Sequence, residues 1–304
     1  MMKISSLNKI AVLYGGETPE RRVSIHSGTQ IINSLKKMGF WVCGIDAKGN
    51  FIDELLKSQY DFVFNALHGG IGENGVINGL LDHFKIYHSG ASVSACSLAM
   101  DQIQSLRIWQ SLALPVPDFI LCKKTDISSA KQFNLPIAIK PCNQGSSIGV
   151  TKLKSWDEFD TAYKKASCYG DVVIQPWIEG KEYTVSIIGE TILPSILIEP
   201  EREFYDYIAK TDKASGTRFH CPSDLSQKDE SMIKLLAKKG FDALGGSGWG
   251  RVDIIRDMNG KFFLLEVNMV PGMTEMSLVP RAAKAHGWKF EDLLERIITL
   301  NIFS

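Results

Sequence analysis

Two apolar runs on either side of Asn259-Gly260 most constrain how this chain can fold. The runs are Trp249–Ile255 and Phe262–Val267. Asn-Gly between two such runs is the strongest short-range signal for a β-hairpin, because both residues tolerate the positive φ of a two-residue turn. The sequence therefore predicts an antiparallel hairpin whose register is set by that turn.

One face of this predicted hairpin is polar. A two-residue turn places Asp253 opposite Glu266 and Arg251 opposite Asn268. Two opposed carboxylates repel each other unless a cation lies between them, and all-oxygen donors favour Mg²⁺. The alternative is an edge hairpin with solvated charges that Arg251 neutralises. The residues predicted on the other face are apolar: Val252, Ile254, Leu265 and Val267.

Composition excludes several classes of protein. The 304 residues include 34 Lys+Arg and 34 Asp+Glu, so the net charge is zero, which argues against a nucleic-acid-binding protein. The six cysteines form no C-x-x-C pair, which argues against a zinc ribbon or a disulfide scaffold. No apolar stretch suits a signal peptide or a membrane helix. We therefore expect a cytoplasmic protein without membrane contact.

The first third of the chain alternates strands and helices. Strands are predicted at Ile10–Tyr14, Phe40–Ile45 and Tyr60–Asn65, and helices at Ser27–Met38 and Val76–Phe84. This alternation is typical of a parallel, doubly wound sheet, which binds ligands at the carboxyl ends of its strands.

The rest of the chain predicts antiparallel α+β structure. Middle strands are predicted at Phe119–Cys122, Ile137–Lys140, Ile148–Lys152, Val172–Gln175 and Tyr183–Ile188. Another strand is predicted at Ile192–Ile198, and helices at Leu98–Leu112, Trp156–Ala166, Asp229–Leu244 and Phe290–Leu300. The polar stretch Lys210–Pro222 lacks apolar periodicity and is interpreted as a lid.

Two loops after the N-terminal strands carry residues suited to a ligand. Glu20 follows the first strand, where its carboxylate either binds a substrate ammonium group or serves as a helix N-terminal charge. His68 opens the glycine-rich stretch after the third strand. The other five histidines lie in ordinary contexts and are interpreted as structural: His26, His83, His88, His220 and His286.

Two later loops are rich in glycine. Lys140 ends a strand, and Asn143–Gly149 follows as a turn whose N–H groups can converge on an anion, or as an ordinary hairpin turn. Gly272 has a backbone N–H that can form an oxyanion site with Arg251, the alternative being a plain Pro-Gly turn. The absence of G-x-x-x-x-G-K-[ST] and G-x-G-x-x-G argues against P-loop and dinucleotide-binding proteins.

In this order, these segments resemble the D-alanine–D-alanine ligases of the ATP-grasp superfamily. The resemblance is carried by Gly15-Gly16 with Glu20-Arg21, His68-Gly69, Lys140-Pro141 with Gly145-Ser146-Ser147, Phe204-Tyr205-Asp206-Tyr207, Gly250-Arg251-Val252-Asp253, and Glu266-Val267-Asn268 with Pro271-Gly272-Met273-Thr274. It implies an α/β (α+β) fold of three units, the last two of which grip ATP. These are an N-terminal Rossmann-like parallel-sheet domain (1–92), a central ATP-grasp domain (93–183) and a C-terminal ATP-grasp and catalytic domain (184–304).

The resemblance also implies an activity and a role for each site residue. ATP would phosphorylate one D-alanine, and the amine of a second would attack the acyl phosphate, giving a peptidoglycan precursor. ATP would contact Lys140, Gln175, Pro176, Trp177, Ile178, Glu182 and Lys210. Two Mg²⁺ ions, or Mn²⁺ in their place, would bind Asp253, Glu266 and Asn268. The first D-alanine would contact Glu20 and His68, and the second would contact Ser277 and Leu278. Ser146 would lie near Glu20. Arg251 and Gly272 would stabilise the oxyanion. A homodimer is implied by analogy.

Four residues depart from the family pattern: Gln102, where a phosphate-contacting lysine is usual, Asn74, Thr211 and Met269. Two alternatives therefore stay open. One is another ATP-grasp carboxylate–amine ligase, such as a D-alanine–D-lactate ligase, which Met269 and the 211–220 loop would discriminate. The other is a homologue that binds nucleotide without turnover.

Overall fold

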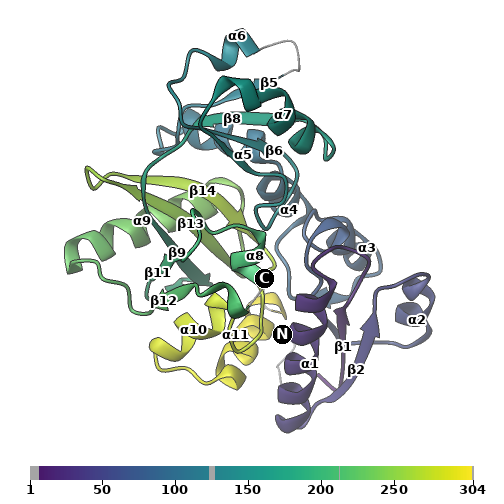
Figure 1. The fold of residues 1–304 in the computed structure, drawn as a ribbon. Coiled ribbons are helices and arrows are strands. Elements are labelled where there is room, and N and C mark those ends of the chain that lie inside the picture. Colours follow the sequence, from purple (N-terminus) through teal and green to yellow (C-terminus); the bar gives the residue numbers. More distant parts are fainter. Residues whose placement is uncertain (1–6, 123–126, 212, 303–304) are drawn as a thin grey trace.

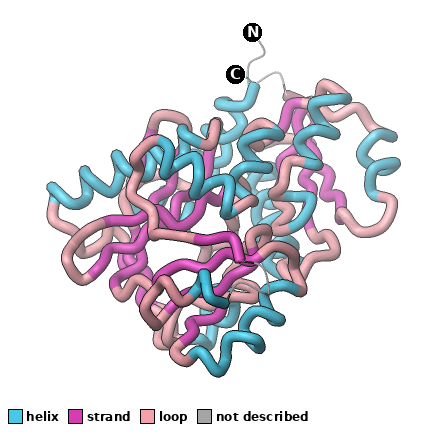
Figure 2. Tube along the Cα trace, turned by 90° about the horizontal axis from the view of Figure 1, so that it is seen from above, coloured by secondary structure: helices cyan, strands magenta, loops and turns pink. Residues whose placement is uncertain are grey.

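The computed structural model describes residues 7–122, 127–211 and 213–302, which form three β-sheets flanked by helices (Figure 1). In Figure 1 the small sheet containing β5 to β8 lies at the top, the largest sheet lies below it, and the N-terminal sheet lies at the lower right. Figure 2, seen from above, shows helices along the outside of the strands. No helix within the described ranges is both long and apolar enough to cross a bilayer.

The N-terminal sheet is parallel with strand order β2-β1-β3-β4, which confirms the predicted architecture. Its elements are β1 (Lys9–Tyr14), α1 (Arg21–Lys37), β2 (Trp41–Asp46), α2 (Phe51–Lys57), β3 (Phe62–Asn65), α3 (Val76–His83) and β4 (Tyr87–His88). Alternate residues of β1 enter two different cores, Ile10 and Val12 on one face and Ala11 and Leu13 on the other. A strand buried on both faces needs an unbroken apolar run, which is what β1 has.

The middle sheet is antiparallel with strand order β5-β8-β6-β7. Its elements are β5 (Ile120–Cys122), α6 (Ile127–Ala130), β6 (Ile137–Pro141), β7 (Thr151–Leu153), α7 (Phe159–Ser167) and β8 (Val172–Pro176). Phe159 and Ala162 of α7 pack into one core with Ile137 and Ile139 of β6. The loop between β6 and β7 carries the Gly/Ser segment toward the other two sheets.

The helix predicted at Leu98–Leu112 is two helices, α4 (Val93–Met100) and α5 (Gln102–Ser111). Asp101 has extended backbone and accepts hydrogen bonds from the N–H groups of Ile103 and Gln104, so it is the N-cap of α5. The Trp109 indole donates to the Gly240 carbonyl at 2.9 Å, and both helices pack against the largest sheet. The domain limits themselves stay a prediction.

The largest sheet is antiparallel with strand order β12-β11-β9-β13-β14, and β10 pairs with β9. Its elements are β9 (Gly180–Ile188), β10 (Thr191–Ile192), β11 (Ile196–Glu199), α8 (Tyr207–Thr211), β12 (Arg218–His220), α9 (Gln227–Ala243), β13 (Trp249–Asp257) and β14 (Phe262–Asn268). The single strand predicted at Ile192–Ile198 is divided, because Pro194 has no N–H to donate. The stretch interpreted as a lid, Lys210–Pro222, contains the end of α8 and β12.

The hairpin turn differs from the prediction, yet the predicted pairs at its polar end are present. The Asp257 N–H donates to the Lys261 carbonyl at 2.9 Å, so the three residues from Met258 to Gly260 form the loop, and Gly260 has φ of 85°. A β-bulge next to Asp253 then adds one residue to β14 and restores the predicted pairs Asp253–Glu266 and Arg251–Asn268. The bulge also places Leu264, rather than the predicted Leu265, in the core.

The last two helices return to the beginning of the chain. α10 (Leu278–Ala285) and α11 (Phe290–Ile302) share one core with α1 and with one face of the N-terminal sheet. In Figure 1 they lie beside α1, near both termini. The N-terminal and C-terminal parts are therefore joined by a buried apolar interface.

Candidate active site

A cavity of about 260 Å³ lies where loops from all three sheets meet. Ten of the site residues predicted from the sequence line it: Glu20, His68, Ser146, Lys210, Arg251, Glu266, Asn268, Gly272, Ser277 and Leu278. Seven others lie outside its lining: Lys140, Gln175, Pro176, Trp177, Ile178, Glu182 and Asp253.

The cavity also contains residues that the sequence did not indicate. Tyr205 belongs to a quoted motif and Glu73 to the glycine-rich stretch after His68, neither with a predicted role, and His26, which the sequence indicates as structural, lines the cavity too. Phe219 and Met276 are further members of this group. The glycine-rich setting of Glu73 was a usable signal, whereas His26 had none, because only the fold brings this part of α1 to the cavity.

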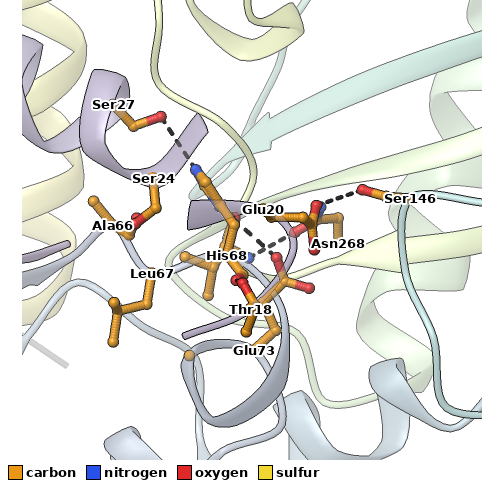
Figure 3. Close-up of polar contacts among 12 residues, drawn as sticks. Thr18, Glu20, Ser24, Ser27, Ala66, Leu67, His68, Glu73, Ser146 and Asn268 are labelled. Carbon is orange, nitrogen blue, oxygen red and sulfur yellow. Dashed lines mark hydrogen bonds and ion pairs between the residues drawn. The ribbon is translucent and has the colours of Figure 1, made fainter. Parts of the chain in front are cut away.

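Glu20 lies at the start of α1, and its side chain makes no capping hydrogen bond there. Instead, the Ser146 hydroxyl donates to the Glu20 carboxylate across 126 residues of sequence (Figure 3). Ser147 donates to the Tyr205 carbonyl at 3.0 Å, so the Gly/Ser loop contacts two other units. Burial and the neighbouring Glu73 raise the pKa of Glu20. A bound ammonium group would relieve that repulsion, which suits this carboxylate to an amino-acid substrate.

Arg251 and Asp253 form a buried, two-pronged ion pair on β13. The guanidinium donates from Nε to Oδ1 at 2.8 Å and from Nη2 to Oδ2 at 2.7 Å, and Asp253 is 2% exposed. Burial alone would raise the pKa of Asp253, but Arg251, Lys210 and the Thr184 hydroxyl lower it to about 2. The hairpin does lie at the edge of its sheet, with β14 as the outer strand, and Arg251 does neutralise Asp253, but the burial of Asp253 contradicts the solvated charge of the alternative interpretation.

Glu266 faces the cavity between two polar groups. The Lys210 ammonium lies 3.7 Å from one carboxylate oxygen, and the Gln102 amide nitrogen lies 3.4 Å from the other. The buried Gln102 Oε1 has no hydrogen-bond partner among the residues that the structure describes. Burial alone would lower the pKa of Lys210, but Glu266, Glu182 and Asp253 raise it. Lys210 therefore stays a cation beside the carboxylates.

Two further charged groups lie close to this cluster. Burial lowers the pKa of Lys140 to about 8, against the opposing effect of Glu266. Burial raises the pKa of Glu182 to about 8, against the opposing effect of Lys210. At the end of β8, the buried Gln175 amide nitrogen has no hydrogen-bond acceptor within the described ranges. The unpaired Gln175 amide can be satisfied by a bound polar ligand, and strongly shifted pKa values such as those of Lys140 and Glu182 are typical of functional sites.

Comparison with known proteins places this geometry in a family. The family model described as "D-ala D-ala ligase C-terminus" matches residues 108–299. A D-alanine–D-alanine ligase of Alkalilimnicola ehrlichii is 41% identical over 297 residues, which cover 97% of this chain and 94% of that protein. The chain belongs to the D-alanine–D-alanine ligase family.

Solved structures of the family share the whole fold. A D-alanine–D-alanine ligase from Bacillus anthracis complexed with ATP superimposes with a TM-score of 0.84 at 30% identity, covering 98% of this chain and 97% of that one. The VanG D-Ala:D-Ser ligase from Enterococcus faecalis gives a TM-score of 0.85 at 25% identity, covering 97% and 99%. The chain therefore has the ATP-grasp fold, as the sequence resemblance implied.

The donor chemistry at the hairpin fits the divalent cation expected of a D-alanine–D-alanine ligase. Within the described residues, no three His, Cys, Asp or Glu side chains form a metal cluster by themselves. The oxygen donors at the hairpin are the carboxylates of Asp253 and Glu266 and the amide of Asn268. Both Asp253 oxygens already accept from Arg251, and Asn268 Oδ1 accepts the Val270 N–H at 2.9 Å, so Glu266 has the most accessible carboxylate of the three. Such a sparse, all-oxygen set suits Mg²⁺, which commonly takes its remaining ligands from substrate phosphates and water.

Proposed function

We propose that this chain joins two D-alanine molecules, using ATP, to form D-alanyl-D-alanine, ADP and phosphate for peptidoglycan precursors. One observation carries the proposal. A single cavity brings together a carboxylate suited to an ammonium group, Glu20, a cation suited to phosphate, Lys210, and the loop that contains the Gly272 N–H. These are the groups that amino-acid activation by ATP requires.

The first step transfers a phosphoryl group. A carboxylate oxygen of the first D-alanine attacks the γ-phosphorus of ATP, the bond to ADP breaks, and an acyl phosphate forms. Glu20 holds the ammonium group of that D-alanine, while Lys140 and Lys210 lie toward the phosphates. Asp253, Glu266 and Asn268 would hold Mg²⁺, which would neutralise phosphate charge when bound. The side chains mainly position the reactants and balance their charge.

The second step forms the peptide bond. The amine of the second D-alanine attacks the acyl carbon, loses a proton, and phosphate leaves with the C–O bond electrons. Arg251, fixed by its ion pair with Asp253, and the Gly272 N–H stabilise the oxyanion. Ser277 and Leu278 begin α10, where the helix dipole favours the carboxylate of the second substrate.

The test is phosphate release from ATP and Mg²⁺ with D-alanine, L-alanine, D-serine, D-lactate or no addition, with product identification by mass spectrometry. Release that requires D-alanine and yields the dipeptide supports the proposal. Preferential use of D-lactate or D-serine as the acceptor would show that this compound, rather than D-alanine, is the second substrate. ATP binding without any release would identify the nucleotide-binding homologue instead.

Two further expectations belong to this proposal. A reaction that consumes ATP to make a cell-wall precursor belongs in the cytoplasm. The homodimer implied by the resemblance stays a prediction, which sedimentation equilibrium would test.

Nucleotide binding at pH 8 is expected to take up about half a proton, because phosphates favour the ammonium form of Lys140, whose pKa is about 8. Titration calorimetry of ADP–Mg²⁺ in two buffers of different ionisation enthalpy measures this uptake. Lys140→Met should lose most of it. The control is Lys154→Met, because the Glu203 carboxylate 2.6 Å away raises the pKa of Lys154 and keeps it charged. Equal uptake in both variants would contradict the assignment of Lys140.

A further inference from the structure

A chain of three hydrogen bonds ties both ends of one catalytic loop to the N-terminal unit. The loop is Val270 to Met273, which contains Gly272. The Met273 N–H donates to Ser27 Oγ, and His68 Nδ1 lies against the Val270 carbonyl, each at 3.1 Å. Ser27 Oγ lies 3.1 Å from His68 Nε2 (Figure 3). Ser27 is on α1 and His68 follows β3, so the loop is held by residues more than 200 positions away.

The direction of each bond follows from the chemistry of the partners. A carbonyl oxygen only accepts, so His68 Nδ1 carries a proton and donates it to Val270. Ser27 Oγ already accepts the Met273 N–H, so its own hydroxyl proton is available to His68 Nε2. The Nδ1–H tautomer of a neutral imidazole accepts that proton at Nε2. Every donor in the chain therefore has an acceptor.

All four residues are buried. Ser27 and Val270 are fully buried, Met273 is 1% exposed and His68 is 4% exposed. Water therefore cannot readily replace a lost partner, so truncation of Ser27 leaves the Met273 N–H and His68 Nε2 unsatisfied. Both ring nitrogens of His68 are also hydrogen-bonded within the protein, so neither is free to bind a substrate.

We propose that Ser27 and His68 are positioning residues that hold the Gly272 N–H where the oxyanion of the second reaction step develops. This inference rests on the proposed ligase function and changes the expected role of His68 from substrate contact to loop support. An oxyanion donor acts only within a narrow distance of the developing charge, and a displacement of about 1 Å can cost about a hundredfold in rate. We therefore expect Ser27→Ala to lower kcat by about 10-fold to 100-fold.

Ser24→Ala is the matched control. Ser24 lies one helical turn earlier on α1 and is equally buried, but its hydroxyl accepts the Gly15 N–H at 2.8 Å and donates to the Ala66 carbonyl at 2.7 Å. Both partners belong to the N-terminal unit. The two variants thus remove the same atom from similar surroundings, and only Ser27→Ala releases the 270–273 loop.

The kinetic arm compares ground-state and transition-state binding. In Ser27→Ala, KM for ATP should stay within about twofold, while affinity for a phosphinate dipeptide analogue of the tetrahedral state should fall by the same factor as kcat. Ser27→Thr keeps a hydroxyl and should recover most of the rate. Equal kcat in Ser27→Ala and Ser24→Ala, or an equal loss of ATP and phosphinate binding, would overturn the proposal.

A second arm needs no substrate. Amide hydrogen exchange of Met273 should become faster in Ser27→Ala and stay unchanged in Ser24→Ala. If the Met273 amide stays protected in Ser27→Ala, Ser27 does not hold the 270–273 loop and the proposal is wrong. If wild-type protein makes no dipeptide but the exchange result holds, the proposed function is wrong while the support of the loop by Ser27 is confirmed. The two failures are therefore distinguishable.

Discussion

Glu266→Gln is expected to lower kcat by at least about a hundredfold, because loss of even a supporting partner of a metal ligand commonly costs 10-fold to 100-fold. The substitution keeps the shape of the side chain beside Lys210 and Gln102 but removes the charge that a divalent cation requires. The change should appear as weaker binding of Mn²⁺ in the presence of nucleotide. Electron paramagnetic resonance of free Mn²⁺ measures this directly, independently of turnover.

The control for that variant is Glu190→Gln. The Glu190 side chain is 94% exposed and its carboxylate lies 3.8 Å from the Lys238 ammonium, on the turn after β9. It should leave both kcat and Mn²⁺ binding unchanged. Unaltered Mn²⁺ affinity in Glu266→Gln would show that the hairpin carboxylates are not the metal ligands.

Arg251→Gln is expected to destabilise the protein by about 3–5 kcal/mol, because breaking a buried ion pair leaves an uncompensated charge. The remaining charge is that of Asp253, which is 2% exposed. Loss of the oxyanion contact should also lower kcat by about 10²–10³-fold. Thermal unfolding and steady-state kinetics measure the two effects separately.

The pH dependence of this effect has a definite sign. In the native protein the pKa of Asp253 is about 2, below the unfolded value of about 3.9. Its ion pair therefore contributes stability above about pH 4 and loses it as pH falls toward 2. In Arg251→Gln, the guanidinium no longer opposes the effect of burial, so the pKa of Asp253 rises. The loss in the free energy of unfolding relative to wild type should therefore be largest at neutral pH and become smaller in acid.

Arg251→Gln/Asp253→Asn separates charge from packing. Removing the orphaned carboxylate should recover part of the lost stability at pH 7 without restoring activity. A double variant less stable than Arg251→Gln at that pH would contradict the buried-charge explanation.

The hairpin shows how far sequence reasoning reaches here. The predicted pairs at the polar end were right, whereas the two-residue turn was wrong, and the β-bulge at β14 compensates for the difference. Phe262 to Leu265 are four consecutive apolar residues, so no alternation of apolar and polar residues indicates which of them is left unpaired at the bulge. Local patterns therefore predicted the two strands but could not determine the bulge.

The candidate site was predictable where its residues stand in loops with unusual composition. Glycine-rich segments indicated Glu20, His68 and Gly272, and the resemblance to a family supplied their expected roles. Ser27 carried no such signal, since a serine inside an amphipathic helix is unremarkable. Its importance comes from contacts with Met273 and His68, which depend on how distant units pack. The roles of individual residues in the reaction stay predictions.

The shared core between the two ends of the chain has a consequence for how the protein is made. Ile10 and Val12 of the first strand pack in the same core as Ile297 and Ile298 of the last helix. A ribosome makes that helix long after the first strand, so one face of the first sheet stays without its cover in the interval. The nascent chain therefore presents an apolar surface during that interval, which makes it a natural client for chaperones that guard such surfaces.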